Sequence, residues 1–335
     1  MNKLFGVTPK DLEQAADLLL SGEIVALPTE TVYGLAALAL NERAVEKIFA
    51  AKRRPPNDPL IIHVANAVSL RGVCRPDERA LALTEAFWPG PLTLVLPKKQ
   101  CVPGLVTSGL DTVAVRSPCH PVFREILQRV NSPLAAPSAN PFGKVSPTTA
   151  RHVVESFGAN HPPVVDGGNT EHGVESTILD LSGSTPAILR PGPITPGEIE
   201  HILGERPDLS DKREVSADAP AASPGLLSSH YRTEAPIRLF PDLPALLDHA
   251  RRTPPPPGTR LITGKPPKHS QRLRTDLVVL TLSETGAAKE IARNLFAVLR
   301  RADAASPPLI LAHLVEETGL GRAVNDRLRR AARVS

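Results

Sequence analysis

A chain of 335 residues is longer than most single hydrophobic cores, so two domains are the default expectation. The composition, 41% apolar and 22% charged, is that of an ordinary globular protein, and no apolar run approaches the length of a bilayer-spanning helix. The N-terminus lacks the apolar segment and small-residue cleavage site of a signal peptide, so we expect a cytoplasmic protein with no membrane role.

The net charge of +4 is unevenly distributed along the chain. Residues 1–204 hold 18 Lys and Arg against 20 Asp and Glu, whereas residues 205–335 hold 21 against 15. We expect the extra Lys and Arg residues of the C-terminal part to lie on a solvated surface. The alternative is that they attract RNA weakly. The three cysteines form no CxxC pair, which argues against a disulfide scaffold or a thiolate zinc site.

The first 204 residues alternate short apolar runs with helical patterns, as in an α/β domain. A capping-box pattern at Thr8 predicts a first helix that begins at Pro9. We predict strands at residues 24–27, 59–65, 92–96, 112–116, 133–136, 164–166, 176–181 and 187–190. We predict helices at residues 41–51, 77–87, 121–130 and 148–157, and a last one from the capping box at Thr195 to near Gly204.

Residues 205–270 contain 12 prolines, so this stretch cannot be mostly regular helix or central strand. We expect a linker at residues 205–236 and an irregular entry into a second domain at residues 237–335. Strands are predicted at residues 260–263, 277–282 and 309–313, and helices at residues 287–302 and 321–332. The sequence therefore predicts a large α/β domain at residues 1–204 and a smaller one after the linker.

Polar segments follow several predicted strands of the larger domain, where open α/β sheets bind ligands. The segment PTETVYGL, residues 28–35, brings two hydroxyls, a carboxylate and a phenol to a strand end, or it forms a turn in which Thr31 caps a helix. The segments AAPSAN and GKVSPT, residues 135–140 and 143–148, offer small side chains that allow a nucleotide to approach the backbone, or a helix cap at Ser146.

Cations and prolines combine in KRRPPNDPL, residues 52–60, which follows a predicted helix. Arg can donate two hydrogen bonds to a phosphate, so phosphate binding is one hypothesis. The alternative is that these cations pair with the helix C-terminus on a solvated surface. His63 interrupts an apolar strand and is either a core residue or a ligand, and Arg116 ends a strand, where it either clamps a carboxylate or forms a structural ion pair.

Neither the P-loop pattern nor the GxGxxG dinucleotide pattern occurs, so any ATP must bind in another way. The HExxH pattern and Cys/His ligand spacings are also absent, and we expect no dedicated metal site.

Eight ordered blocks closely resemble the threonylcarbamoyl-AMP synthase (YrdC/Sua5) family: PTETVYGL, KRRPPNDPLIIHV, FWPGPLTLVL, TVAVRSP, PLAAPSANPFGKVSPT, DGG, GVESTILDL and ILRPGPIT. Downstream, SPGLLSSHY, ARNLFAVLRRAD and GLGRAVNDRLRRAA are similar to the linker and C-terminal domain of the longer members. The resemblance covers nearly the whole chain. It implies a twisted mixed open sheet with helices, followed by a smaller Rossmann-like α/β domain.

This resemblance implies an activity as well. L-threonine, bicarbonate or CO2, and ATP would be condensed into threonylcarbamoyl-AMP and pyrophosphate, with Mg2+ expected to accompany ATP. A separate tRNA threonylcarbamoyl-transferase complex would then modify adenosine 37 of tRNA, so weak or no direct tRNA binding is expected. No covalent nucleophile is needed for this chemistry, and positive charge from Lys52 and Arg54 would assist it.

The resemblance also implies the binding residues, position by position. L-threonine would be held by Thr31, His63, Arg116, Ala136 and Ser176. ATP would be held by Lys52, Arg54, Asp58, Thr112, Ser138, Asn140, Ser146 and Arg190, with Tyr231 of the linker closing over the nucleotide. The linker keeps Tyr231 but lacks the basic residue before it and the Ala-Pro after it that are usual in the family.

Two other functions are weighed against this one. An RNA-binding module would use the basic C-terminal half, but aromatic residues make up only 3% of the chain, too few for base stacking between the cations. A carbamoyltransferase like the hydrogenase-maturation proteins that share this domain would need zinc-finger and acylphosphatase-like segments, and none is recognisable here.

Overall fold

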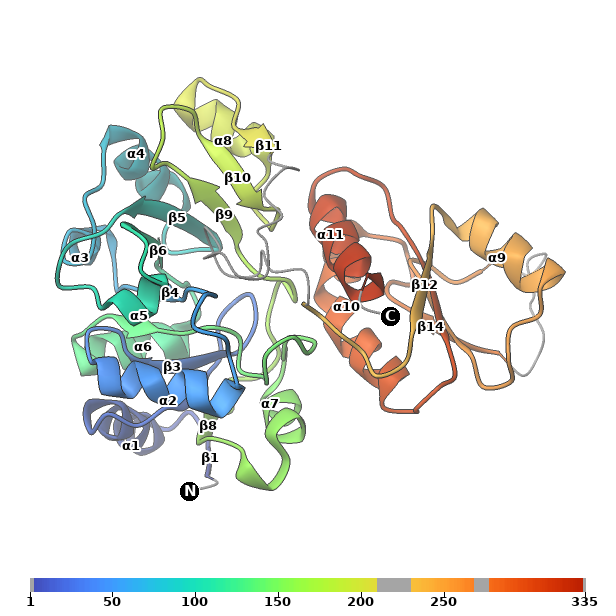
Figure 1. The fold of residues 1–335 in the computed structure, drawn as a ribbon, viewed down its shortest axis with the longest axis horizontal. Helices are drawn as coiled ribbons and strands as arrows, with labels where there is room; N and C mark the ends of the chain where they lie inside the picture. Colours follow the sequence, from blue (N-terminus) through green and yellow to red (C-terminus); the bar gives the residue numbers. More distant parts are fainter. Residues whose placement is uncertain (1–2, 210–229, 268–276, 334–335) are drawn as a thin grey trace. The chain divides into compact units, whose positions relative to one another are not determined.

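The structure, a computed structural model, describes residues 3–209, 230–267 and 277–333 and divides into two units (Figure 1). The first unit holds the described residues up to 209, except for two short segments, 143–145 and 172–174. Those two segments belong with the residues from 230 onward in the second unit.

The first unit is built on one large mixed sheet, with the strand order β1-β8-β2-β3-β7-β4-β6-β5-β9-β10-β11 in the part of the chain that the structure describes. Pairs such as β4/β6 and β5/β9 are parallel, whereas β2/β3 and β5/β6 are antiparallel. The strands are β1 (Leu4–Phe5), β2 (Val25–Leu27), β3 (Gly34–Leu38), β4 (Ile61–His63), β5 (Leu92–Pro97), β6 (Thr112–Arg116), β7 (Leu134–Ala135), β8 (Val164–Val165), β9 (Thr177–Asp180), β10 (Ala187–Arg190) and β11 (Asp208–Leu209).

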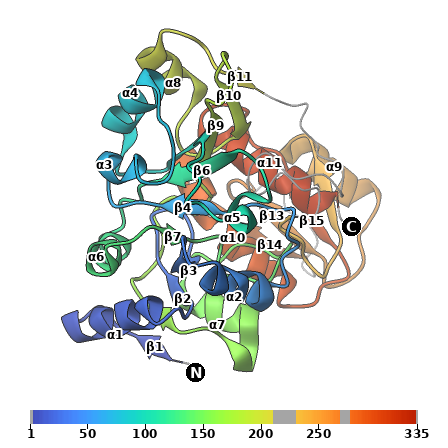
Figure 2. The ribbon, with the colours of Figure 1, turned by 60° about the vertical axis from the view of Figure 1, so that its left-hand side comes forward.

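Helices cover both faces of this sheet. They are α1 (Pro9–Leu20), α2 (Glu42–Lys52), α3 (Ala67–Leu70), α4 (Glu78–Phe87), α5 (Gly104–Thr107), α6 (Pro121–Val130), α7 (Ala150–Phe157) and α8 (Pro196–Leu203). Helices α1 and α6 lie side by side in both ribbon views (Figure 1, Figure 2) and share an apolar cluster with Val25 and Leu27. Ala26 belongs to a second cluster, with residues of α2 and α4, because successive strand residues point to opposite faces.

Side-chain caps explain where several helices begin. Thr8, Asn41 and Asp77 each accept a hydrogen bond from a backbone N–H of the first helical turn, which leaves fewer unsatisfied donors at the helix start. Thr195 and Glu198 form the predicted capping box of α8.

The second unit contains a smaller sheet whose strands are all parallel, in the order β12-β15-β13-β14 among its described residues. Its elements are β12 (Ile237–Phe240), α9 (Leu243–Arg252), β13 (Arg260–Thr263), β14 (Val278–Thr281), α10 (Ala288–Asp303), β15 (Ile310–His313) and α11 (Leu320–Ala332). Parallel strands that alternate with helices form a Rossmann-like α/β layer arrangement. The predicted fold class, a mixed α/β sheet followed by a smaller α/β domain, is confirmed.

One open alternative and one prediction about elements were wrong. The segment after PTET is not a capped helix, because it continues as strand β3, antiparallel to β2. The expected irregular entry after residue 236 instead contains β12 and α9. Proline does not prevent this helix, because Pro244 lies in its first turn, where a missing N–H costs no helical hydrogen bond.

Candidate active site

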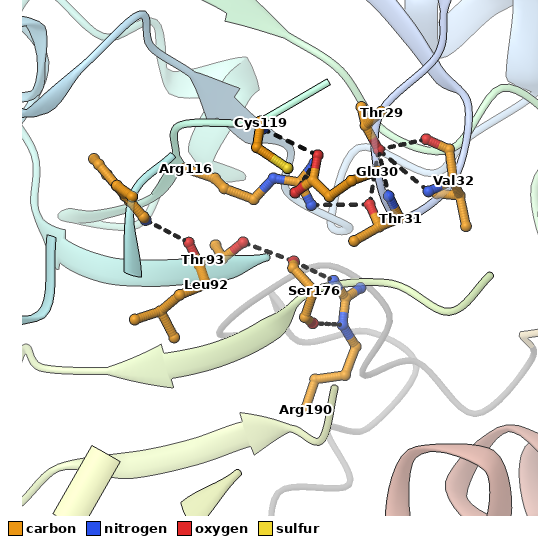
Figure 3. A network of polar contacts seen from close by, with 11 residues as sticks. Thr29, Glu30, Thr31, Val32, Leu92, Thr93, Arg116, Cys119, Ser176 and Arg190 are labelled. Carbon is orange, nitrogen blue, oxygen red and sulfur yellow. Dashed lines mark hydrogen bonds and ion pairs between the residues drawn. The ribbon is translucent and has the colours of Figure 1, made fainter. Parts of the chain in front are cut away.

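The candidate site lies at the ends of several strands of the large sheet, where polar residues gather (Figure 3). His63 ends β4 and Arg116 ends β6, and these two residues are paired in the parallel register of the two strands. Thr29 to Thr31 follow β2, and Ser176 immediately precedes β9. The sheet therefore assembles side chains from four sequence segments at one place.

A tight turn after β2 fixes the direction of its hydroxyl groups. Thr29 Oγ1 donates to the carbonyl oxygen of Val32 at 2.7 Å and also lies 2.8 Å from Thr31 Oγ1. Because a hydroxyl has one proton and Thr29 directs its proton to Val32, we assign Thr31 as the donor between the two threonines. Thr31 Oγ1 accepts from Arg116 Nη1 at 2.9 Å, so it has only acceptor capacity left for a ligand.

Arg116 is 3% exposed, yet its guanidinium group is only partly used by the protein. Nη1 donates to Thr31, and Nη2 lies 3.5 Å from Glu30 Oε1, a long ion pair. Nε and Nη2 have no hydrogen-bond partner among the described residues. These two atoms form one edge of the guanidinium, which is the edge that can donate two parallel hydrogen bonds to a carboxylate.

His63 lies beside Arg116 and is 3% exposed. Its ring centroid is 5.1 Å from that of Phe123, and its Nδ1 has no hydrogen-bond partner in the described part of the chain. Burial, and secondarily the positive charge of Arg116, holds the pKa of His63 well below its ordinary value. The lowered pKa makes His63 a neutral imidazole near neutral pH.

Ser176 belongs to a second group of polar contacts in Figure 3. Its Oγ lies 2.7 Å from Thr93 Oγ1 and accepts from Arg190 Nη2 at 3.1 Å. Arg190 Nε also donates to the Ser176 carbonyl oxygen, and all three side chains are buried. Strands β5, β9 and β10 thus hold the Ser176 hydroxyl in a defined position.

The predicted phosphate-binding cations are buried, so the solvated-surface alternative was wrong. Lys52, at the end of α2, donates from Nζ to the carbonyl oxygens of Ser138 and Asn140, at 2.5 Å each. Arg54 forms an ion pair with Asp58 at 2.8 Å and donates to two backbone carbonyl oxygens at residues 58 and 59. Burial, then the charge of Arg54, lowers the pKa of Lys52, and the Asp58 charge opposes this shift.

The remaining predicted ATP residues are more widely spread. Ser146 donates to Glu175 at 2.6 Å, and the helix cap of α7 is Thr149, so the alternative of a cap at Ser146 was wrong. Thr112 begins β6, four residues before Arg116, which places it about 13 Å further along the strand at 3.3 Å per residue. The structure therefore places Thr112 at the opposite end of β6 from Arg116.

Two other predicted residues have simple settings. Ala136 directly follows β7 and donates its backbone N–H to the Ile61 carbonyl oxygen. Tyr231 belongs to the second unit, where it is 2% exposed, has a φ of 65° and stacks on Phe296 at 5.2 Å. Its predicted role over the nucleotide stays a prediction.

Some contacting residues were missed by the sequence analysis: Thr29, Glu30, Thr93, Cys119 and Glu175. Glu30 and Thr29 lay within a segment already singled out for its polar groups, but nothing in the sequence showed which oxygens face Arg116. Thr93 had no signal, because a threonine within a strand is common in any sheet.

Known proteins resemble this chain along nearly its whole length. Residues 17–192 match the family described as "Telomere recombination", and residues 194–333 match "Threonylcarbamoyl-AMP synthase, C-terminal domain". Among curated proteins, the threonylcarbamoyl-AMP synthase of Pyrococcus abyssi is 40% identical, over 95% of this chain and 93% of its own length. The enzyme of the same name from Bacillus subtilis is 39% identical, over 96% and 92%.

Among solved structures, the P. abyssi Sua5 protein complexed with L-threonine has a TM-score of 0.89 and covers 99% of this chain and 97% of its own. No helix in the described residues is long and apolar enough to cross a membrane. Both halves of the chain match, in order, across nearly the full length of these relatives. The chain belongs to the threonylcarbamoyl-AMP synthase family.

Proposed function

We propose that this chain condenses L-threonine, bicarbonate or CO2, and ATP into threonylcarbamoyl-AMP and pyrophosphate, which makes it a nucleotidyltransferase. The observation that carries this proposal is the open Nε/Nη2 edge of the buried Arg116, beside the Thr31 hydroxyl. A buried guanidinium edge without partners is costly unless a ligand satisfies it. A carboxylate such as that of L-threonine matches its geometry.

The threonine side of the proposed site combines five residues. Arg116 would receive the carboxylate, and Thr31 would accept a hydrogen bond from a donor on the amino acid. Neutral His63 and the Ser176 hydroxyl would contact the remaining polar groups, and Ala136 would leave room for the substrate. The crystal structure of the P. abyssi relative with L-threonine supports an amino-acid site in this fold.

For the ATP side we propose Lys52, Arg54, Asp58, Thr112, Ser138, Asn140, Ser146, Arg190 and Tyr231. The observed bonds suggest that Lys52 and Arg54 act partly by bracing the backbone around Ser138 and Asp58. A bound polyphosphate would favour the charged form of Lys52, which burial disfavours in the free protein. ATP binding would then draw a proton onto this lysine.

In the proposed reaction the ammonium group of threonine first gives up a proton to solvent, and the neutral amine forms an N–C bond to CO2. The nitrogen then loses a second proton, which leaves a carbamate. A carbamate oxygen then attacks the α-phosphorus of ATP, and pyrophosphate leaves. Negative charge is crowded among oxygens in this step, so substrate positioning and nearby cations should contribute most of the rate enhancement. No covalent intermediate with the protein is required.

The described residues contain no group of three or more His, Cys, Asp or Glu side chains that could hold a metal ion. We therefore propose that Mg2+ enters with the ATP phosphates, and no step is assigned to a protein-held metal. We further propose a cytoplasmic location, a downstream complex that transfers the threonylcarbamoyl group to tRNA, and little direct tRNA binding. The domain limits of 1–204, 205–236 and 237–335 are likewise proposals.

The test is pyrophosphate release from ATP by the purified full-length chain. We expect release that requires both L-threonine and bicarbonate, together with a threonylcarbamoyl-AMP product detected by mass spectrometry. A folded sample that releases no pyrophosphate, or releases it equally without threonine, would contradict the proposed function. Salt-dependent RNA binding without turnover would favour the RNA-binding alternative.

A further inference from the structure

Glu30 is a buried carboxylate that has no role in the proposed reaction as described above. It is 2% exposed and lies between the two threonines of the turn after β2. Its Oε2 accepts the backbone N–H of Cys119 at 3.2 Å. Its Oε1 faces Arg116 Nη2 at 3.5 Å and has no hydrogen-bond partner among the described residues. Figure 3 shows this carboxylate next to the Arg116 guanidinium, with its hydrogen bond to Cys119.

Two oxygens beside Arg116 are thus set up to accept hydrogen bonds from a ligand. Glu30 Oε1 is an unpartnered carboxylate oxygen, and Thr31 Oγ1 has already used its only proton on Thr29. On the guanidinium, the Nε/Nη2 edge can only donate. The buried region therefore offers a donor edge for an anionic group directly next to an acceptor pair for a cationic group.

The charges favour the same kind of ligand. Glu30 and Arg116 together are neutral, and burial disfavours the charged forms of the nearby ionisable groups. Burial lowers the pKa of His63 and of His120, and burial, together with Glu30, raises the pKa of the Cys119 thiol to about 11. A simple carboxylate bound to Arg116 would leave one uncompensated negative charge, whereas a zwitterion would leave none.

We propose that Glu30 binds the ammonium group of the amino-acid substrate, with Thr31 Oγ1 as the second acceptor. In an α-amino acid the carboxylate and the ammonium group are attached to one carbon, so their partners must lie a few ångströms apart. The 3.5 Å between Arg116 Nη2 and Glu30 Oε1 meets this requirement. Glu30 thereby selects zwitterionic α-amino acids over carboxylates that lack the amine. This inference rests on the proposed function, because it assigns the amine recognition of the same site.

The test compares ligands that differ in one charged group, by isothermal titration calorimetry with the full-length chain. The probes are L-threonine, β-hydroxybutyrate, which lacks the amine, and L-threoninamide, which lacks the carboxylate. A charge-assisted hydrogen bond corresponds to roughly a 10- to 100-fold change in affinity. We expect the wild-type chain to prefer threonine over β-hydroxybutyrate by about this factor.

The variant Glu30→Gln removes the charge with little change in shape. We expect it to weaken threonine binding and to strengthen β-hydroxybutyrate binding, because Arg116 then lacks a competing negative charge. General damage to the site would weaken both ligands. The threonine-to-threoninamide ratio should remain within a few-fold of the wild-type ratio. A matched control is Asp180→Asn, which changes another buried carboxylate, at the end of β9, that accepts a hydrogen bond from Ser182; it should alter neither ratio.

The outcomes separate the two proposals. If the wild-type chain binds no threonine and releases no pyrophosphate, the proposed function fails. If threonine binds but Glu30→Gln weakens all three probes equally, the role of Glu30 is overturned. If Glu30→Gln does not fold, Glu30→Asp decides, since it keeps the charge but withdraws the carboxylate. We expect Glu30→Asp to lower the preference for threonine over β-hydroxybutyrate several-fold, and an unchanged preference would refute the proposal.

Discussion

Two arginines of the first unit are both buried at the ends of their elements, but the protein uses them in opposite ways. Arg54 forms a 2.8 Å ion pair with Asp58 and bonds to two backbone carbonyl oxygens. Arg116 donates one hydrogen bond to Thr31 and faces Glu30 at 3.5 Å, with two donor atoms unpartnered among the described residues. The protein itself satisfies most of the donors of Arg54, whereas Arg116 keeps donor capacity that the proposed amino-acid site would use.

This contrast extends to the residues around each arginine. Near Arg54, Lys52 spans from α2 to the carbonyl oxygens of Ser138 and Asn140, so the cations there support a loop. Near Arg116, the Glu30 carboxylate has an oxygen without a hydrogen-bond partner in the described residues. A buried polar group without a partner lowers stability, and such groups are retained where function needs them.

The largest expected effect is the loss of stability when either arginine is replaced. Arg54→Met leaves the Asp58 carboxylate buried without its cation, so we expect the free energy of unfolding to fall by about 3–5 kcal/mol. Arg116→Met also leaves a buried carboxylate, Glu30, without its cation, but the lost ion pair is longer and Glu30 keeps the hydrogen bond from the Cys119 N–H, so we expect a smaller loss. Urea unfolding followed by circular dichroism measures both.

The control for these variants is Arg43→Met on the exposed side of α2, which should change stability by less than about 0.5 kcal/mol. Equal losses for Arg54→Met and Arg116→Met would break the comparison, because they would show that both arginines are structural. A smaller loss for Arg54→Met than for Arg116→Met would show that Arg116 stabilises the fold more than Arg54 does.

Much of the fold could be predicted because its signals are local. The capping box at Thr195 and the apolar runs of β5, β6 and β10 define elements within a few residues. The path of the chain after Thr31 was not predictable in this way, because β3 forms by pairing with β2 and β7 rather than from its own pattern.

The site could also be predicted from the sequence only in part. The ordered motifs identified both arginines as site candidates, Arg116 for L-threonine and Arg54 for ATP. Which guanidinium is saturated depends on where residues 30 and 58 lie in space, and hydrogen-bond distances between segments cannot be read from spacing along the chain.

His63 provides a second, smaller test on the Arg116 side. Its pKa in the folded chain is depressed below the ordinary value of 6.5, so at intermediate pH only the unfolded chain binds the proton. Stability is then fully present above about pH 6.5 and declines on acidification towards the folded pKa, by at most about 1.4 kcal/mol per pH unit for this residue. We expect His63→Gln to flatten that decline.

Urea unfolding at several pH values between 5 and 7 measures this slope. His120 and His313 have lowered pKa values too, so part of the decline should persist in the variant. His161→Gln, in the short connection before β8, is the comparison variant for a general effect of removing a histidine. A slope that His63→Gln leaves unchanged would show that Arg116 and burial do not control this imidazole.

The smallest expected effect concerns Thr93, which extends the comparison to a third arginine. Arg190 and Thr93 both contact the Ser176 hydroxyl, so the protein holds this group from two sides. Thr93→Val keeps the shape but removes one hydrogen bond, which corresponds to about 1 kcal/mol, or roughly a 5-fold loss of threonine affinity if Ser176 contacts the substrate.

Thr84→Val is the matched control, since its buried hydroxyl donates to the Leu81 carbonyl oxygen within α4. Both variants should lose similar stability, but only Thr93→Val should weaken threonine binding in calorimetry. Equal threonine affinities in the two variants would mean that the contacts around the Ser176 hydroxyl support the fold and do not contribute to threonine binding.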